Sequence, residues 1–282
     1  VFNLVMGRGS VIGDPLVNHP GINAISFTGS QGVGARIAQQ CATNLKKVQL
    51  EMGGKNPQII LDDADLAQAV ELSVQSAFFS TGQRCTASSR LIVTDGIYGK
   101  FVEAVQARMA TLKIGDALAA GIDIGPVSSL SQLQQDLDYV AIGQAEGAQL
   151  AAGGTRLERS TEGFYMAPAL LLDTTSAMRI NREEVFGPVA SVIRVKDYEA
   201  ALAESNNTPF GLSAGIATTS LKYAAHFKRH SQAGMVMVNL PTAGVDYHVP
   251  FGGRKASSYG PREQGKYAQE FFTTVKTAYT LA

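Results

Sequence analysis

Short β-rich runs alternate with longer helical stretches along almost the whole chain, and this alternation constrains the fold more than any other feature. The strand candidates are NAISF, KVQL, PQIIL, RLIV, VASVIRV, SAGIAT and MVMVNL. The helix candidates are Gly32–Thr43, Asp65–Ser80, Tyr98–Lys113, Ser129–Glu146, Tyr198–Ser205 and Leu221–Ser231. Strands that alternate with amphipathic helices favour α/β units around a mainly parallel sheet. The sequence therefore predicts an α/β fold.

Composition excludes several classes of protein. The 282 residues are 45% hydrophobic, which is enough for a large core in one or two domains. Lysine plus arginine balances aspartate plus glutamate at 24 each, without a basic cluster, so neither a nucleic-acid nor an anionic-membrane partner is expected. No apolar stretch approaches the roughly 20 residues that span a bilayer. Two cysteines without a framework pattern favour a reducing, cytoplasmic compartment.

Both ends of the sequence have the pattern of strands. The chain begins VFNLV, apolar from its first residue and without an initiator methionine, and we expect it to be a piece of a longer protein. The C-terminal run EFFTTVKTAYTLA alternates as a strand does. A terminal strand without a nearby hairpin partner predicts either pairing with another subunit or an edge strand of its own domain.

Cys85 follows a predicted helix in the stretch FFSTGQRCTASSR. A lone cysteine is more often a buried structural thiol than a nucleophile. Here the helix should end near Ser80–Gly82, which leaves the residues up to Cys85 as a turn that presents the thiol. Arg84 adds positive charge, which favours the thiolate, and free main-chain N–H groups after the turn would suit an oxyanion. From these residues alone both interpretations stay open.

A nucleophilic thiol needs a base, and the sequence offers two kinds. The four histidines stand in no diagnostic motif. His226 and His230 have helical spacing, but no acidic or cysteine ligand accompanies them, so no metal site is predicted. Glu51 ends the strand candidate KVQLE before Gly53–Gly54, and carboxylates at such strand ends face the ligand crevice of parallel sheets. The alternative is an exposed residue at a strand end.

Two further segments could contact a nucleotide. In NAISFTGSQGVGARI an apolar run turns at Thr28–Ser30 into a helix, whose first N–H groups would suit a phosphate. The glycines at positions 29, 32 and 34 do not match the G-x-G-x-x-G spacing. In REEVFGPVASVIRV, Glu183 and Glu184 precede a tight turn and a strand, where paired carboxylates are usually surface residues.

The order of the motifs is far more specific than any one of them. FTGS..VG, LEMGGKNP, FFSTGQRC, EEVFGPV and PFGG.K.S follow one another. In this order the sequence resembles the NAD(P)-dependent aldehyde dehydrogenase superfamily over the whole chain. The segment from VNLPTAGVDYH to the C-terminus looks most like the branch that oxidises α-ketoglutaric semialdehyde (2,5-dioxovalerate). The resemblance implies a catalytic domain with an open, twisted, mainly parallel sheet, together with the last part of a Rossmann-like cofactor domain.

The resemblance also assigns roles to residues. Cys85 matches the nucleophile that forms a thiohemiacetal and then a thioester, with its main-chain N–H as half of an oxyanion hole. Glu51 matches the general base that activates the hydrolytic water. The residues that match the contacts to the cofactor, NAD or NADP, are Gly29, Ser30, Val33, Gly34, Glu184, Phe186 and, less closely, Gln132.

For the substrate, the resemblance implies a semialdehyde of a dicarboxylic acid. Such a substrate would need a cation near the mouth of the site, and the candidates are Arg84, Arg254 and Arg262. The stretch from Thr242 through Val245 to His248 would line the aldehyde tunnel.

The resemblance implies three regions: residues 1–53 from the NAD(P)-binding domain, a catalytic domain over 54–256, and a return segment with an oligomerisation strand over 257–282. That strand predicts a homo-oligomer, either a dimer or a tetramer. Superfamily members begin upstream of VFNLV, with most of the dinucleotide-binding units and an oxyanion-hole asparagine in that segment. We therefore expect little or no dehydrogenase activity from this chain. The alternatives are a non-oxidising interaction module and a cofactor-independent thiol esterase.

Overall fold

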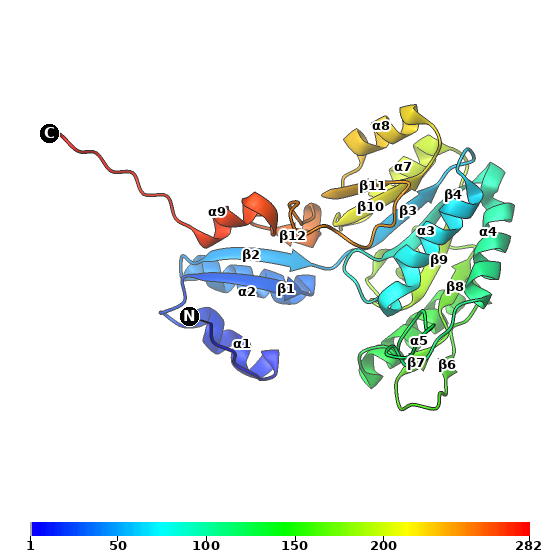
Figure 1. Ribbon diagram of the computed structural model, residues 1–282, viewed down its shortest axis with the longest axis horizontal. Coiled ribbons are helices and arrows are strands. Elements are labelled where there is room, and N and C mark those ends of the chain that lie inside the picture. Colours follow the sequence, from blue (N-terminus) through cyan, green and yellow to red (C-terminus); the bar gives the residue numbers. More distant parts are fainter. Residues whose placement is uncertain (1) are drawn as a thin grey trace. The chain divides into compact units, whose positions relative to one another are not determined.

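A computed structural model describes residues 2–282 and divides the chain into two compact units (Figure 1). The larger unit consists of Gly54–Gly244 and Gly253–Lys255. The smaller unit consists of Val1–Gly53, Val245–Gly252 and Ala256–Ala282. The chain therefore crosses between the units several times.

A seven-stranded sheet forms the centre of the larger unit (Figure 1). Its strand order is β11 (Met235–Val238), β10 (Ser213–Ala217), β3 (Asn56–Ile60), β4 (Ser88–Thr94), β9 (Val189–Val195), β8 (Ala169–Leu172) and β5 (Gln149–Ala152). All neighbouring pairs are parallel except β5 and β8. The prediction of a mainly parallel α/β sheet is confirmed. The segments of β5 and β8 were not among the strand candidates.

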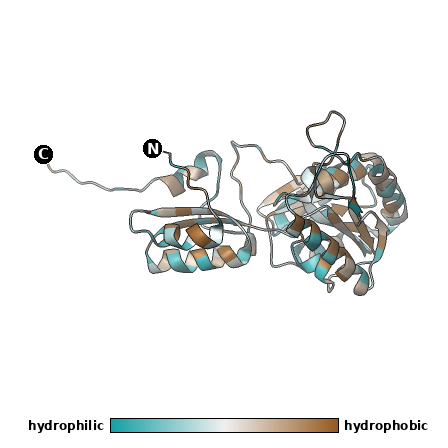
Figure 2. Ribbon diagram, turned by 90° about the horizontal axis from the view of Figure 1, so that it is seen from below, coloured by the Kyte–Doolittle hydropathy of each residue, from teal (hydrophilic) through white to brown (hydrophobic). Residues whose placement is uncertain are grey.

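Helices cover both faces of this sheet. The larger unit contains α3 (Leu66–Phe78), α4 (Asp95–Ala110), α5 (Leu130–Ala145), α6 (Arg179–Arg182), α7 (Tyr198–Asn206) and α8 (Leu221–His230). Leu91 and Val93 of β4 belong to the core cluster with α3 and α4, whereas Ile92 belongs to the cluster with α7 and α8. Because the strands are buried on both faces, they appear in the sequence as continuous apolar runs. Figure 2 shows that the helices, in contrast, carry both hydrophobic and hydrophilic residues.

The smaller unit is built on a β-α-β arrangement. Strand β1 (Ala24–Gly29) pairs in parallel with β2 (Lys47–Met52), and α2 (Gln31–Thr43) connects them. Strand β12 (Ser258–Tyr259) adds to β2 in the antiparallel direction. A small core joins α1 (Gly9–Asn18), α2 and β2 through Val17, Ile37, Cys41, Leu50 and Met52. Helix α1 was not predicted.

Neither end of the described chain forms the strand that its sequence pattern suggests. Residues 2–8 precede α1 without a strand, and residues 273–282 follow α9 (Ala268–Phe272) without one. The prediction of a C-terminal strand is therefore wrong for the single chain. A strand needs a second strand to hydrogen-bond with, and this segment has no such strand beside it within residues 2–282. Pairing with another subunit stays a prediction.

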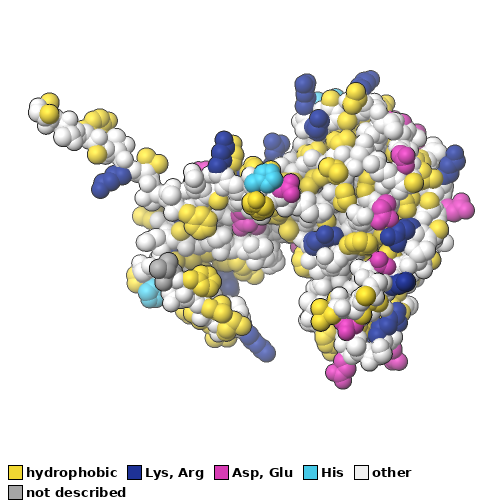
Figure 3. All heavy atoms as spheres, in the orientation of Figure 1, with side chains coloured by type: hydrophobic (Ala, Val, Ile, Leu, Met, Phe, Trp, Pro, Cys, Tyr) yellow, Lys and Arg dark blue, Asp and Glu magenta, His cyan; other side chains and the backbone are white. Residues whose placement is uncertain are grey.

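Two surface properties of the described residues bear on possible partners. No helix within residues 2–282 is long and apolar enough to cross a membrane. On the face shown in Figure 3, basic and acidic side chains are interspersed rather than gathered into a patch of one sign.

Candidate active site

The turn before β4 carries Cys85 close to the amino end of this strand. Helix α3 ends at Phe78, and the backbone then turns sharply through Ser80, Thr81 and Gly82, which all have positive φ. Cys85 is half-buried, and β4 begins at Ser88. A helix end followed by a turn that carries the thiol is what the sequence predicted.

Glycine is required at position 82. Its φ is +64°, and an ideal Cβ would lie 2.2 Å from the carbonyl oxygen of Gly187. The turn that carries Cys85 is thus packed directly against the backbone of the segment that precedes β9.

One pocket contains four of the predicted site residues. Cys85 and Arg84 line it together with Glu184 and Phe186; the other lining residues are Gly54, Ala77, Gly82, Ala87, Ser89, Val185 and Gly187. The segments that form it precede β3, β4 and β9. The pocket therefore lies at the amino ends of these parallel strands, whereas ligands of open α/β sheets usually bind at the carboxyl ends.

Asn56 fixes the main chain around Cys85, a role that sequence reasoning missed. Its Nδ2 donates to the carbonyl oxygens of Cys85 at 2.7 Å and Ala87 at 2.9 Å. Its Oδ1 accepts from the Ser213 N–H at 3.0 Å. The side chain is 2% exposed. Its position in LEMGGKNP, two residues after the glycine pair, was the available signal, because buried strands rarely begin with an unpaired polar residue.

Arg84 is partly committed to the end of α3. Its guanidinium donates to the carbonyl oxygens of Gln75 at 3.0 Å and Phe79 at 3.2 Å. Burial lowers the pKa of Arg84, and the interaction with Cys85 acts in the opposite direction. A cation that caps a helix C-terminus is electrostatically favourable. Arg84 also places positive charge beside the thiol.

Glu184 is held inside the pocket rather than at the surface. Its Oε1 accepts from the Gly54 N–H at 2.9 Å. Burial raises the pKa of Glu184, while the Gly54 N–H and the charge of Lys55 lower it. Burial and the charge of Arg90 lower the pKa of Lys55 to about 7, against the effect of Glu184. The Lys55 Nζ has no hydrogen-bond partner within residues 2–282.

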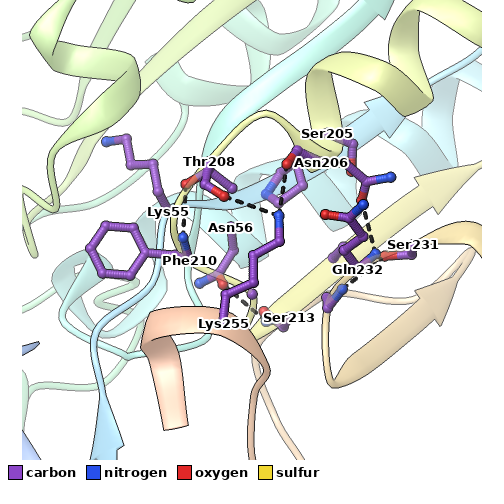
Figure 4. Close-up of a pocket in the computed structure, with 14 residues that line it drawn as sticks. Lys55, Asn56, Ser205, Asn206, Thr208, Phe210, Ser213, Ser231, Gln232 and Lys255 are labelled. Atoms are coloured by element: carbon purple, nitrogen blue, oxygen red, sulfur yellow. Dashed lines mark hydrogen bonds between the residues drawn. The ribbon is translucent and has the colours of Figure 1, made fainter.

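A second pocket, which does not contain Cys85, is lined by Lys55, Asn56 and Lys255 among other residues (Figure 4). Lys255 donates from Nζ to the carbonyl oxygens of Asn206 at 2.7 Å and Thr208 at 3.0 Å, at the C-terminal end of α7. Figure 4 shows Lys55 extending away from this pocket, while Asn56 points toward Ser213. The polar side chains of Asn56 and Lys255 are thus hydrogen-bonded within the protein, and we interpret this second pocket as structural.

In the smaller unit, Glu51 occupies the end of β2 and is only 3% exposed. The Ser258 hydroxyl donates to Glu51 Oε2 at 2.6 Å. Burial raises the pKa of Glu51 to about 7, with Glu263 acting in the same direction and Ser258 and Arg262 against it. The alternative of an exposed strand-end carboxylate is therefore wrong. A carboxyl group that titrates near neutral pH is suited to act as a general base.

The smaller unit also contains the predicted phosphate-binding turn. Gly29 ends β1, Ser30 is the N-cap of α2 without a side-chain capping bond, and Val33 is 40% exposed in the first turn. An ideal Cβ on Gly34 would lie 2.5 Å from Met52 Sδ, so this glycine allows close packing of α2 on β2. The N–H groups of a first helical turn have no acceptor within the helix. These residues fit the phosphate part of a nucleotide.

Other predicted contacts have different surroundings. Gln132 donates from Nε2 to Asp136 Oδ1 at 2.8 Å and to the Val185 carbonyl at 3.0 Å, so its amide nitrogen is occupied. Thr242 is 0% exposed, and its hydroxyl lies 2.7 Å from Ser88 Oγ. Its side chain is therefore enclosed in this structure, and its predicted contact with substrate stays a prediction.

The remaining candidates lie elsewhere. Val245 and His248 belong to the smaller unit, as does Arg262, whereas Arg254 is exposed in the larger one. Within residues 2–282 no group of three or more histidine, cysteine or acidic side chains could hold a metal ion.

Comparison with known proteins shows which family and which relatives the chain is similar to. The model of the "Aldehyde dehydrogenase family" matches residues 1–278. The chain is 47% identical over 281 residues to an "Alpha-ketoglutaric semialdehyde dehydrogenase" of Bacillus subtilis (strain 168), covering 99% of this chain and 58% of that protein. It is 39% identical over 282 residues to a "2,5-dioxopentanoate dehydrogenase" of Saccharolobus solfataricus, again covering 99% and 58%. The chain thus spans little more than half the length of these relatives.

Among solved structures, betaine aldehyde dehydrogenase of Staphylococcus aureus in complex with NAD+ is similar, with a TM-score of 0.91 and 33% identity. The match covers 95% of this chain and 53% of that one.

Proposed function

This chain belongs to the aldehyde dehydrogenase family, and on that premise we propose that it carries the nucleophile, the general base and part of the cofactor site of an NAD(P)-dependent aldehyde oxidation. The observation that carries this proposal is the pocket in which Cys85 lies with Glu184 and Phe186. A thiol that captures an aldehyde beside a bound nucleotide needs both the thiol and a nucleotide-binding carboxylate in the same pocket.

Cys85 is the proposed nucleophile. Its thiolate attacks the aldehyde carbon, the carbonyl π-electrons move to oxygen, and a thiohemiacetal forms. Arg84 places positive charge beside the thiol, which favours the thiolate. The Asn56 bonds to the carbonyl oxygens of Cys85 and Ala87 fix the direction of the main chain. The Cys85 N–H would stabilise the oxyanion.

Glu51 is the proposed general base. After oxidation the substrate is a thioester on Cys85, and water must attack it. Glu51 takes a proton from that water, the carbon–sulfur bond breaks, and the carboxylic acid leaves as the thiol is restored. A carboxyl group whose pKa is about 7 can accept this proton at neutral pH.

The residues present fit a nicotinamide dinucleotide in two places. The first turn of α2, with Gly29, Ser30, Val33 and Gly34, would hold the pyrophosphate side. Glu184 would accept from the nicotinamide ribose, because one of its oxygens is already oriented by the Gly54 N–H. Phe186 would lie beside the ring. When bound, the nicotinamide would take the hydrogen and two electrons from the substrate carbon.

The proposed substrate is a semialdehyde of a dicarboxylic acid, such as α-ketoglutaric semialdehyde. The two relatives described above carry names for this activity. Arg84 supports the proposal, because it is a cation on the wall of the pocket that contains Cys85. A second candidate function is a thiol esterase, since Cys85 and a base could hydrolyse activated esters without cofactor.

One experiment separates these functions. The chain is assayed with a p-nitrophenyl ester and, separately, with α-ketoglutaric semialdehyde plus NAD or NADP. Because we expect little or no dehydrogenase activity from this chain, the NAD(P)-dependent rate should be low. A low rate that requires both NAD or NADP and Cys85 supports the main proposal, whereas ester hydrolysis with no NAD(P)-dependent rate at all supports the esterase. Cys85→Ala should lower the rate of either activity by roughly a thousandfold or more, since the covalent route is lost. Cys41→Ala, at a buried cysteine of α2, is the matched control. Activity that survives Cys85→Ala would refute both functions.

A further inference from the structure

One face of α5 is hydrogen-bonded to the segment 183–187, which carries Glu184 and Phe186. Gln132 and Gln135 both donate from Nε2 to the Val185 carbonyl oxygen, at 3.0 and 2.8 Å. One turn later, the Tyr139 hydroxyl donates to Glu183 Oε2 at 2.6 Å. These residues are spaced by three and four positions and therefore lie on one side of the helix.

Asp136 lies at the centre of this face and is completely buried. Its side chain is 0% exposed, and Oδ1 accepts from Gln132 Nε2 at 2.8 Å. Oδ2 is enclosed and has no hydrogen-bond partner within residues 2–282. An ideal Cβ on Gly187 would lie 2.1 to 2.4 Å from the carboxyl atoms of Asp136. The carboxyl group is thus packed onto the Gly187 backbone.

The segment 183–187 contains a strained backbone conformation. Phe186 has a φ of 60°, which is unfavourable for a residue with a side chain. On the other side of this segment, the Gly187 carbonyl packs against Gly82 in the turn that carries Cys85. The segment is therefore enclosed between α5 and that turn.

We propose that Asp136 is a positioning residue: it holds the Val185–Gly187 turn so that Glu184 and Phe186 keep their places in the pocket with Cys85. Its relevance to catalysis rests on the function proposed above. Its structural effect does not, because the contacts exist without cofactor or substrate.

The neutral acid is the form that suits this position. Burial raises the pKa of Asp136 to about 7, against the hydrogen bond from Gln132. An ionised carboxylate would leave a charged oxygen enclosed without a partner. Several elements that pack against α5 carry titratable groups. The segment 183–187 carries Glu183 and Glu184, and the turn on its other side, beyond Gly82, carries Arg84 and Cys85. Helix α6 carries Arg179 and Arg182, whereas β5 and β8 carry no titratable group.

The sign of the pH effect follows from this shift. Because the folded pKa of about 7 lies above the usual 3.8, the stabilising contribution of Asp136 is complete below about pH 4 and is lost as the pH rises through about 7. Asp136→Asn keeps the acceptor and the shape without this titration.

The experiment measures amide hydrogen exchange at Gly54, whose N–H is bonded to Glu184 Oε1, by NMR on the 282-residue chain without ligand. Protection is expected to fall in the wild type between about pH 6 and pH 8, after correction for intrinsic exchange. It should fall less in Asp136→Asn, where the remaining pH dependence comes from Lys55, whose pKa is about 7. Asp136→Ala should lower protection roughly tenfold at pH 6, the size expected for one lost buried hydrogen-bonding group.

Asp138→Ala is the matched control, because Asp138 accepts from Gln134 Nε2 at 2.8 Å in the same i, i+4 geometry but is exposed. It should leave protection at Gly54 unchanged. Parallel pH dependence in wild type and Asp136→Asn would overturn the proposal, as would full protection in Asp136→Ala. Should Asp136→Ala fail to fold, the comparison with Asp136→Asn decides alone. No enzyme assay enters, so loss of the proposed dehydrogenase function would leave this result standing.

Discussion

At the scale of single residues, burial determines what the carboxyl groups of this chain can do. Glu51 ends a strand in the sequence, but whether it faces solvent depends on β12, which brings Ser258 from 207 positions away. The antiparallel pairing of β12 with β2 helps to enclose the carboxyl group. Its pKa of about 7 is a consequence of that packing.

Replacing Glu51 by glutamine should change how stability depends on pH. Its folded pKa of about 7 lies above the usual 4.5, so its contribution to stability is complete below about pH 4.5 and is lost as the pH rises through about 7. Relative to Glu51→Gln, the wild type should lose up to about 3 kcal/mol of unfolding free energy between about pH 4 and pH 8. Urea unfolding across this range measures the difference.

Glu103→Gln is a suitable control for this measurement, because Glu103 is exposed on α4. That variant should follow the wild type at every pH. Identical pH profiles of the wild type and Glu51→Gln would show that Glu51 does not titrate near neutral pH.

At the scale of elements, local signals located α3 well and left the turn after it undetermined. The expected helix Asp65–Ser80 is observed as Leu66–Phe78, with Asp65 as the N-cap accepting from the Gln68 N–H. The acidic residues and the apolar periodicity explain this success. The positive φ of Ser80 and Thr81 has no such local signal, because neither residue type favours that conformation.

Gly82→Ala tests how tightly this turn is packed. A methyl group there would meet the Gly187 carbonyl oxygen at 2.2 Å in a backbone conformation with φ of +64°. We expect the free energy of unfolding to fall by at least about 2 kcal/mol, and Cys85 to react faster with iodoacetamide. Denaturant unfolding and mass spectrometry measure the two effects.

Gly99→Ala is the matched control, because it should raise the free energy of unfolding in the same denaturant measurement. Gly99 lies inside α4, and nothing lies within 4 Å of an ideal Cβ there. Alanine should therefore stabilise the chain by roughly 0.5 to 1 kcal/mol. If Gly82→Ala were as stable as Gly99→Ala, the packing of Gly82 on Gly187 would be contradicted.

At the scale of the whole molecule, the exposed C-terminal segment suggests assembly. Residues 273–282 alternate as a strand does, yet they lack a neighbouring strand within residues 2–282. Val275 and Tyr279 are 97% and 95% exposed. We propose that this segment pairs with another copy of the chain, which would satisfy its backbone groups and cover these side chains.

Deletion of residues 273–282 should convert a dimer or tetramer into a monomer in sedimentation velocity. Lys276→Ala, within the same segment, should leave the assembly unchanged, because side chains contribute less than backbone pairing to strand addition. A monomeric wild-type chain would contradict the proposal directly.

The sequence by itself determined the α/β class, most helices and the identity of the nucleophile candidate. The fold class and the helices follow from local periodicity, and the nucleophile candidate follows from the order of motifs along the whole chain. Only the tertiary structure decided that the pocket lies at the amino ends of β3, β4 and β9, and that Asn56, Asp136 and Gly187 support it. It also enclosed Thr242 beside Ser88 and left residues 273–282 without a neighbouring strand among the described residues. Burial and strand pairing depend on residues far apart in the chain, and a local pattern does not contain that information.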